Sequence, residues 1–64
     1  MATMQGDELK ALRKAAGLTG AALAEAIGMS RKSIVEMEGG KAPIELRTEL
    51  AVRYVVERAG KAAK

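Results

Sequence analysis

The chain has 64 residues, a formal net charge of +3 at pH 7 and a pI near 9.6, and it contains neither cysteine nor histidine. A chain this short makes one domain at most, and the missing residue types argue against a disulfide framework, a metal site and histidine-based catalysis. The basic balance favours anionic partners. No apolar run approaches the ~20 residues that cross a bilayer, and no leader segment is evident, so we expect a cytoplasmic protein without membrane contact.

The first predicted helix covers residues 7–16. Its acidic residues come first and its basic residues come last, which suits the helix dipole. Leu9, Leu12 and Ala16 follow the i, i+3, i+7 spacing of a buried stripe, and Gly17 ends the helix. Residues 1–6 form a short lead that we expect to be mobile.

The central stretch predicts two short helices, residues 20–27 and 31–38, joined by a tight turn. Thr19 and Ser30 are suited to cap these helices, since their hydroxyls can accept a bond from a first-turn amide. Gly28 allows the left-handed backbone that a sharp exit needs. The spacing turns aliphatic side chains inward and leaves four polar residues on the outward side of the second helix: Arg31, Lys32, Ser33 and Glu36.

The last predicted helix covers residues 44–59, after a glycine-rich turn that contains Pro43, and Gly60 ends it. On one face, Leu46, Leu50 and Tyr54 are expected to cover the core. The other face carries more apolar residues than a three-helix core can cover: Ile44, Ala51, Val52, Val55, Val56 and Ala59. The whole pattern predicts an all-α fold, a compact bundle of four helices in one domain over residues 1–64, with a central helix-turn-helix.

With these elements in place, the chain resembles the phage-repressor and Cro-like (XRE-like) helix-turn-helix DNA-binding proteins and their lambda-repressor-like domain. The resemblance covers about residues 7–55. It rests on residues that stand in register with the family pattern: Leu12-Arg13, Gly17-Leu18-Thr19, Leu23-Ala24, Gly28, Ser30, Ile34, Glu38 and Gly40. In this family the second motif helix enters the major groove and the first spans the backbone. The resemblance therefore implies a regulator of transcription that binds double-stranded DNA.

Carried onto this sequence, the resemblance makes the base-reading residues Arg31, Lys32, Ser33 and Glu36. Arg31 or Lys32 can donate to guanine, and Ser33 can bond a base or a phosphate. Glu36 can accept from cytosine as a specificity residue, or it is a bystander held by Lys32 four residues earlier.

The resemblance also implies contacts to DNA phosphates, from Thr19, Gly20, Ala21, Ser30 and Lys41. Gly20 departs from the family, in which a glutamine commonly stands at this position and bonds a phosphate. The backbone amides of Gly20 and Ala21 remain as donors at a helix N-terminus. Lys41 either contacts a phosphate or only keeps the turn soluble.

In the resembled family the positions of Arg13 and Glu38 pair between the first and third helices. We interpret this pair as architectural, because the planar fork of arginine can meet a carboxylate with two bonds. It would fix the angle of the recognition helix.

The surplus apolar face of the last helix predicts a homodimer, since a domain this small gains by burying an exposed apolar face against its own copy. Two recognition helices about 34 Å apart would read an inverted repeat. The expected interface residues are Val52, Val55, Val56 and Ala59. The alternative is that this side of the helix packs on the N-terminal lead.

The function expected from the sequence is a dimeric (auto)repressor of phage or mobile-element type: Cro-like, anti-CRISPR-associated or antitoxin-like. The alternative is a small helical protein-protein interaction module that uses the apolar face of helix 44–59. We do not expect an enzyme, because the carboxylates are scattered and no nucleophile stands beside a base. Nor do we expect a cofactor, a metal or a small-molecule ligand.

Overall fold

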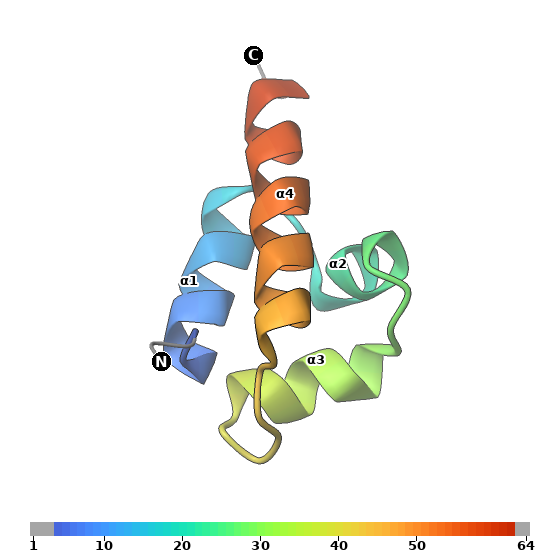
Figure 1. Ribbon diagram of the computed structural model, residues 1–64. Coiled ribbons are helices and arrows are strands. Elements are labelled where there is room, and N and C mark those ends of the chain that lie inside the picture. The colour runs from blue at the N-terminus through green and yellow to red at the C-terminus, as the bar shows by residue number, and fades with distance from the viewer. Residues whose placement is uncertain (1–3, 63–64) are drawn as a thin grey trace.

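The computed structural model describes residues 4–62, without the side chains of residues 61 and 62, and this part of the chain forms four helices and no strand. They are α1 (Gly6–Ala15), α2 (Gly20–Ala26), α3 (Arg31–Glu38) and α4 (Leu46–Ala62). α4 stands against α1 and α2, and α3 crosses below its N-terminal end (Figure 1). The predicted all-α bundle with a central helix-turn-helix is confirmed. Within residues 4–62, no helix has the length and apolar character to span a membrane.

Side-chain caps begin both helices of the motif. The Thr19 hydroxyl accepts a bond from the Ala22 amide at 3.0 Å, and the Ser30 hydroxyl accepts one from the Ser33 amide at 3.1 Å. Between the two helices, Gly28 has a φ of 73°, a conformation that strains residues with a Cβ. The local signals in the sequence thus determine where α2 and α3 begin and how the chain turns between them.

The core lies where the four helices face one another. Its buried side chains come from every helix, from the segment before α1 and from the connection between α3 and α4: Met4, Leu9, Leu23, Ala24, Ile34, Met37, Ile44 and Val52. Burying one large aliphatic side chain contributes about 1.5–3 kcal/mol, so a few such residues account for much of the stability of a domain this small.

Met4 and Gly6 are packed against the rest of the domain, which corrects the expectation of a mobile lead at these two positions. Met4 is 3% exposed, and its amide donates to Glu49 Oε1 at 3.2 Å. Gly6 lies so close to the end of α3 that a Cβ there would be 2.5 Å from the carbonyl oxygen of Met37. Burial of Met4 offsets the entropy lost in ordering this segment. The expectation for residues 1–3 falls outside the described part of the chain.

α4 begins later and ends later than the predicted range of 44–59. Pro43 and Ile44 precede the helix, and Ile44 is 6% exposed because it inserts into the core from this non-helical segment. The helix continues through Gly60 to Ala62. A glycine costs about 1 kcal/mol relative to alanine in a helix, and this is too little to end a helix that is already packed along most of its length.

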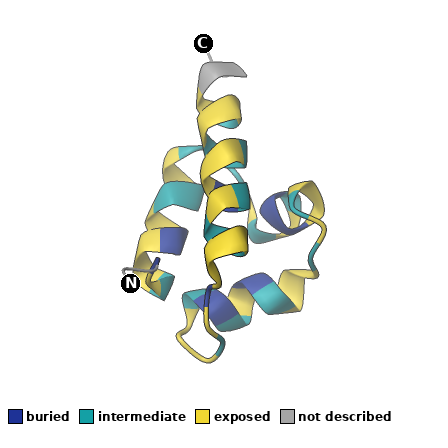
Figure 2. Ribbon diagram, viewed as in Figure 1, coloured by how far each residue is buried: buried dark blue, intermediate teal, exposed yellow. Residues whose placement is uncertain are grey.

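The two faces of α4 are the reverse of the prediction. Leu46, Leu50 and Tyr54 are 55–60% exposed, whereas Val52 is 0% exposed. We call these three exposed residues the outer stripe of α4; the exposed side of this helix is visible in Figure 2.

Of the predicted interface residues Val52, Val55, Val56 and Ala59, the prediction for Val52 is therefore wrong, because this side chain is fully buried within the monomer. Val52 belongs to the core, Val55 and Val56 are half-buried against it, and Ala59 is half-buried. Both apolar stripes have helical spacing, and periodicity alone does not tell which one faces the core. The arrangement agrees better with the alternative prediction, because Met4 of the lead lies in the same core as Val52 and bonds to Glu49 of α4.

Candidate nucleic-acid interface

The first turn of α3 projects two basic side chains at the surface. Arg31 and Lys32 follow the Ser30 cap directly and are exposed. The same helix is held from behind by Ile34 and Met37, which are 1% and 3% exposed. Among the described residues neither Arg31 nor Lys32 forms an ion pair. Two cationic donors without an ion-pair partner among the described residues thus lie on the exposed side of a short helix whose other side is packed in the core.

Ser33 and Glu36 occupy a different environment, although the sequence grouped them with Arg31 and Lys32. Both are half-buried, and both line a groove of about 250 Å³ between α3 and the segment that leads into α4. The Ser33 hydroxyl lies 3.0 Å from that of Ser30, so it takes part in the cap. No ion pair joins Lys32 to Glu36 within the described chain, and the proposed bystander contact is not formed.

The turn after α3 folds back onto that helix. The amides of Lys41 and Ala42 donate to the Glu36 carbonyl oxygen at 2.8 and 3.2 Å, and Gly40 has a φ of 80°. The Lys41 side chain is exposed beside the C-terminal end of α3. The backbone of this turn is thereby held while its one lysine remains available to solvent.

The residues expected at DNA phosphates lie mainly at the beginnings of the motif helices. Thr19, Ala21 and Ser30 are exposed, and Gly20 is half-buried. The hydroxyls of Thr19 and Ser30 each accept one capping bond, which leaves the O–H of each able to donate to a phosphate oxygen. The first amides of α2 have no partner within the helix, as at any helix N-terminus.

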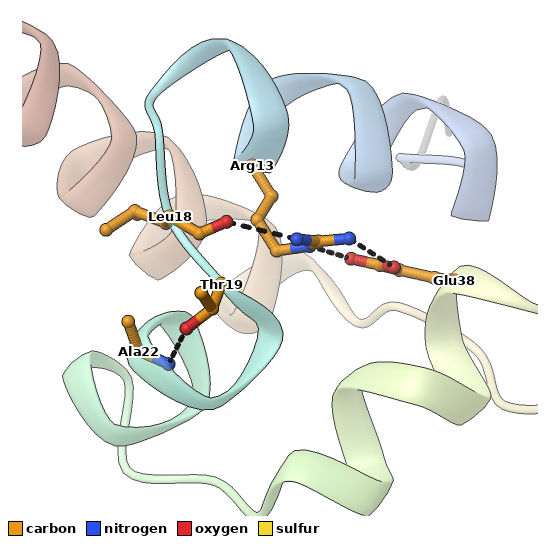
Figure 3. A network of polar contacts seen from close by, with 5 residues as sticks. All are labelled: Arg13, Leu18, Thr19, Ala22 and Glu38. Atoms are coloured by element: carbon orange, nitrogen blue, oxygen red, sulfur yellow. Dashed lines mark hydrogen bonds and ion pairs between the residues drawn. The ribbon is translucent and has the colours of Figure 1, made fainter.

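Arg13 and Glu38 form a two-bond pair between α1 and α3 (Figure 3). Arg13 Nε donates to Glu38 Oε2 at 2.7 Å, and Nη2 donates to Oε1 at 3.2 Å. A third bond, at 3.0 Å, runs from Nη1 to the carbonyl oxygen of Leu18, the residue before the α2 cap. One guanidinium thus joins α1, the entry to α2 and the end of α3.

The pair is largely shielded from water, with side-chain exposures of 14% for Arg13 and 12% for Glu38. The hydrogen bond to Glu38 raises the pKa of Arg13 above its ordinary value, against the lowering effect of desolvation. An arginine with a raised pKa keeps its charge throughout the ordinary pH range, so the contribution of this pair to stability is not lost through deprotonation of Arg13.

Sequence reasoning missed one exposed residue of α3. Val35 is 57% exposed, and it stands four residues after Arg31 and three after Lys32. Residues at these spacings are neighbours on a helix surface. The signal was present in the periodicity, because a helix that buries Ile34 and Met37 turns residue 35 outward, but the outward residues named from the sequence were polar ones only.

A family model described as a helix-turn-helix domain matches residues 6–62 of this chain, which is nearly the whole sequence. The chain belongs to the helix-turn-helix domain family. Comparisons with curated proteins and with solved structures give no match. Helix-turn-helix domains are DNA-binding modules whose second helix docks in the major groove, and the family is generally not enzymatic. In this helix-turn-helix protein the second helix is α3, which carries Arg31 and Lys32.

Proposed function

We propose that this helix-turn-helix protein is a sequence-specific transcriptional regulator, a repressor that binds an inverted-repeat operator as a dimer. The observation that carries the proposal is the pair of exposed, unpaired cations, Arg31 and Lys32, on the first turn of α3. In helix-turn-helix complexes the N-terminal residues of the second helix contact base edges. Arginine and lysine there donate to guanine N7 and O6.

Ser33 and Glu36 take secondary roles in this proposal because they are half-buried beside the groove next to α3. Glu36 accepts from a cytosine amino group only at the edge of the contact area. Arg31 and Lys32 therefore carry most of the direct reading, and we expect a guanine in each half-site.

Phosphate contacts orient the domain on the duplex. The proposed donors are the backbone amides of Gly20 and Ala21, the hydroxyls of Thr19 and Ser30, and the Lys41 side chain, which is exposed at the far end of α3. Donors near both ends of the motif would hold α3 in the groove.

The dimer is proposed through the outer stripe of α4, in place of the buried valine face. Leu46, Leu50 and Tyr54 recur every four residues along one exposed side of α4. Three side chains are few beside the roughly 20–30 residues per partner of a standard interface. The contact is therefore weak in free solution, and two copies meet when both are bound to adjacent half-sites.

A stand-alone repressor of this type would be encoded by a phage or a mobile element, as a Cro-like, anti-CRISPR-associated or antitoxin-like regulator. It would act in the cytoplasm, associated with the nucleoid when it is bound to DNA. Binding at its own promoter would make it an autorepressor that competes with polymerase.

In vitro selection from duplexes with a random central segment tests this function. We expect enrichment of an inverted repeat whose half-site centres lie about 10 base pairs apart. The full repeat should bind at least tenfold more tightly than one half-site, and Leu50→Ala should remove most of that advantage. If no sequence is enriched, the proposed repressor function is contradicted. If the full repeat and the half-site bind with equal affinity, the proposed dimer is contradicted.

The exposed outer stripe also favours a second candidate, a small interaction module that binds another protein through α4. This candidate predicts that DNA binding is no stronger than that of a generic basic protein and shows no sequence preference. The same selection distinguishes the two, because only the regulator enriches a defined sequence.

A further inference from the structure

The exposed surface of α3 contains one apolar side chain beside its two cations. Val35 is 57% exposed, while every other valine of the described chain is buried or half-buried. A β-branched residue on a helix surface is not favoured by helix propensity and gains nothing from the core. The position of Val35 next to Arg31 and Lys32 puts it on the surface that the proposed function brings into the major groove.

We infer that Val35 is a specificity-determining residue that recognises the C5-methyl group of a thymine; this inference rests on the proposed DNA-binding function. Of the four bases in DNA, only thymine presents an apolar group in the major groove, and apolar side chains contact it directly. A branched aliphatic side chain offers two methyl groups and no hydrogen bond. It therefore distinguishes thymine from cytosine, which presents an amino donor instead.

The surroundings of Val35 support this assignment. Four residues earlier Arg31 is suited to guanine, so one patch combines a guanine contact with a thymine contact on neighbouring base pairs. Val35 itself lies near the middle of α3, whose two ends are held by the Ser30 cap and by the Arg13–Glu38 pair. Because both ends are fixed, the reach of this short side chain toward a base is also fixed.

Uracil substitution in DNA provides a direct test, since it removes the thymine methyl group and leaves base pairing unchanged. The duplex enriched by the parent protein is measured by fluorescence anisotropy with each thymine replaced in turn by deoxyuridine. At one thymine per half-site we expect binding about fourfold weaker, the effect of losing one buried methyl group. If none of the single thymine-to-deoxyuridine replacements changes the affinity, the inference is overturned.

The variant Val35→Ala completes the test. Because the side chain is exposed, the variant should fold like the parent, as circular dichroism would verify. We expect it to bind the thymine and deoxyuridine duplexes equally. Lys32→Ala is the matched control: it removes a neighbouring donor, weakens binding to both duplexes, and should keep the fourfold methyl effect.

A methyl effect of unchanged size in Val35→Ala would overturn the inference while leaving the proposed function intact. Failure of the parent to enrich any sequence would instead overturn the proposed function, and this inference with it.

Discussion

Arg13 and Glu38 meet through two hydrogen bonds of 2.7 and 3.2 Å, with both side chains nearly excluded from water. The same arginine also binds the Leu18 carbonyl oxygen, so the contact holds three helices at their junction. Breaking such a pair leaves the remaining charge poorly solvated, and this costs more than the net strength of the bond itself.

We predict that Arg13→Ala lowers the free energy of unfolding by about 2 kcal/mol, which for a domain of this size lowers the melting temperature by about 10 °C. The double variant with Glu38→Ala should lose less than the sum of the single variants, because neither charge is then left alone. Arg47→Ala is the control, since its ion pair with Glu45 is 87% and 60% exposed and should contribute little. Equal melting temperatures for the parent and Arg13→Ala would refute the architectural role.

Two glycines in helices should respond oppositely to alanine. At Gly6 a Cβ would stand 2.5 and 2.6 Å from the carbonyl oxygens of Met37 and Glu38, and the backbone cannot yield easily. We expect Gly6→Ala to destabilise the domain by about 1–3 kcal/mol, as overpacking does. At Gly60 a Cβ would meet no atom within 4 Å, so Gly60→Ala should stabilise α4 by about 0.5 kcal/mol. Urea denaturation of both variants measures these changes, and a stabilised Gly6→Ala would disprove the close contact of α1 with α3.

The assignment of the two faces of α4 can be checked by truncating one residue on each. Val52 is 0% exposed, so Val52→Ala should cost about 2 kcal/mol through lost burial and a residual cavity. Leu50 is 59% exposed, and Leu50→Ala should change the stability of the monomer by less than about 0.5 kcal/mol. Thermal melts at low protein concentration measure both changes. A larger loss of stability for Leu50→Ala than for Val52→Ala would show that the face assigned as exposed is the buried one.

Lys41 should act on DNA through charge alone. If its side chain contacts a phosphate, Lys41→Ala weakens binding to all duplexes and reduces the slope of log affinity against log salt by about one. Lys10→Ala is the control, because Lys10 is also exposed but lies on α1, outside the motif. A salt slope that both variants leave unchanged would favour the alternative that Lys41 only keeps the turn soluble.

Much of the fold follows from local signals that are legible in the sequence. The caps Thr19 and Ser30 and the left-handed Gly28 place α2, α3 and their turn within one residue of the predicted bounds. These signals act over a few residues, so they do not depend on the rest of the chain. The Arg13–Glu38 contact spans 25 positions and was anticipated only through the family resemblance.

Features set by tertiary packing were not predictable in the same way. The two apolar stripes of α4 look alike in sequence, and only the surrounding core decides that Val52 is buried and Leu50 exposed. Ile44 reaches the core from a non-helical segment, which no helical period describes. In the candidate site, Ser33 and Glu36 differ from Arg31 and Lys32 because the segment before α4 covers one side of α3.

The measurement that tests sequence-specific DNA binding most directly is fluorescence anisotropy of the protein on its selected duplex and on a scrambled duplex, with Arg31→Ala beside the parent. We predict that the parent prefers the selected duplex by about a thousandfold or more, and that Arg31→Ala loses about 1–3 kcal/mol on that duplex alone. Equal, steeply salt-dependent binding to both duplexes would show that the protein is attracted only to DNA phosphates, and it would contradict sequence-specific binding.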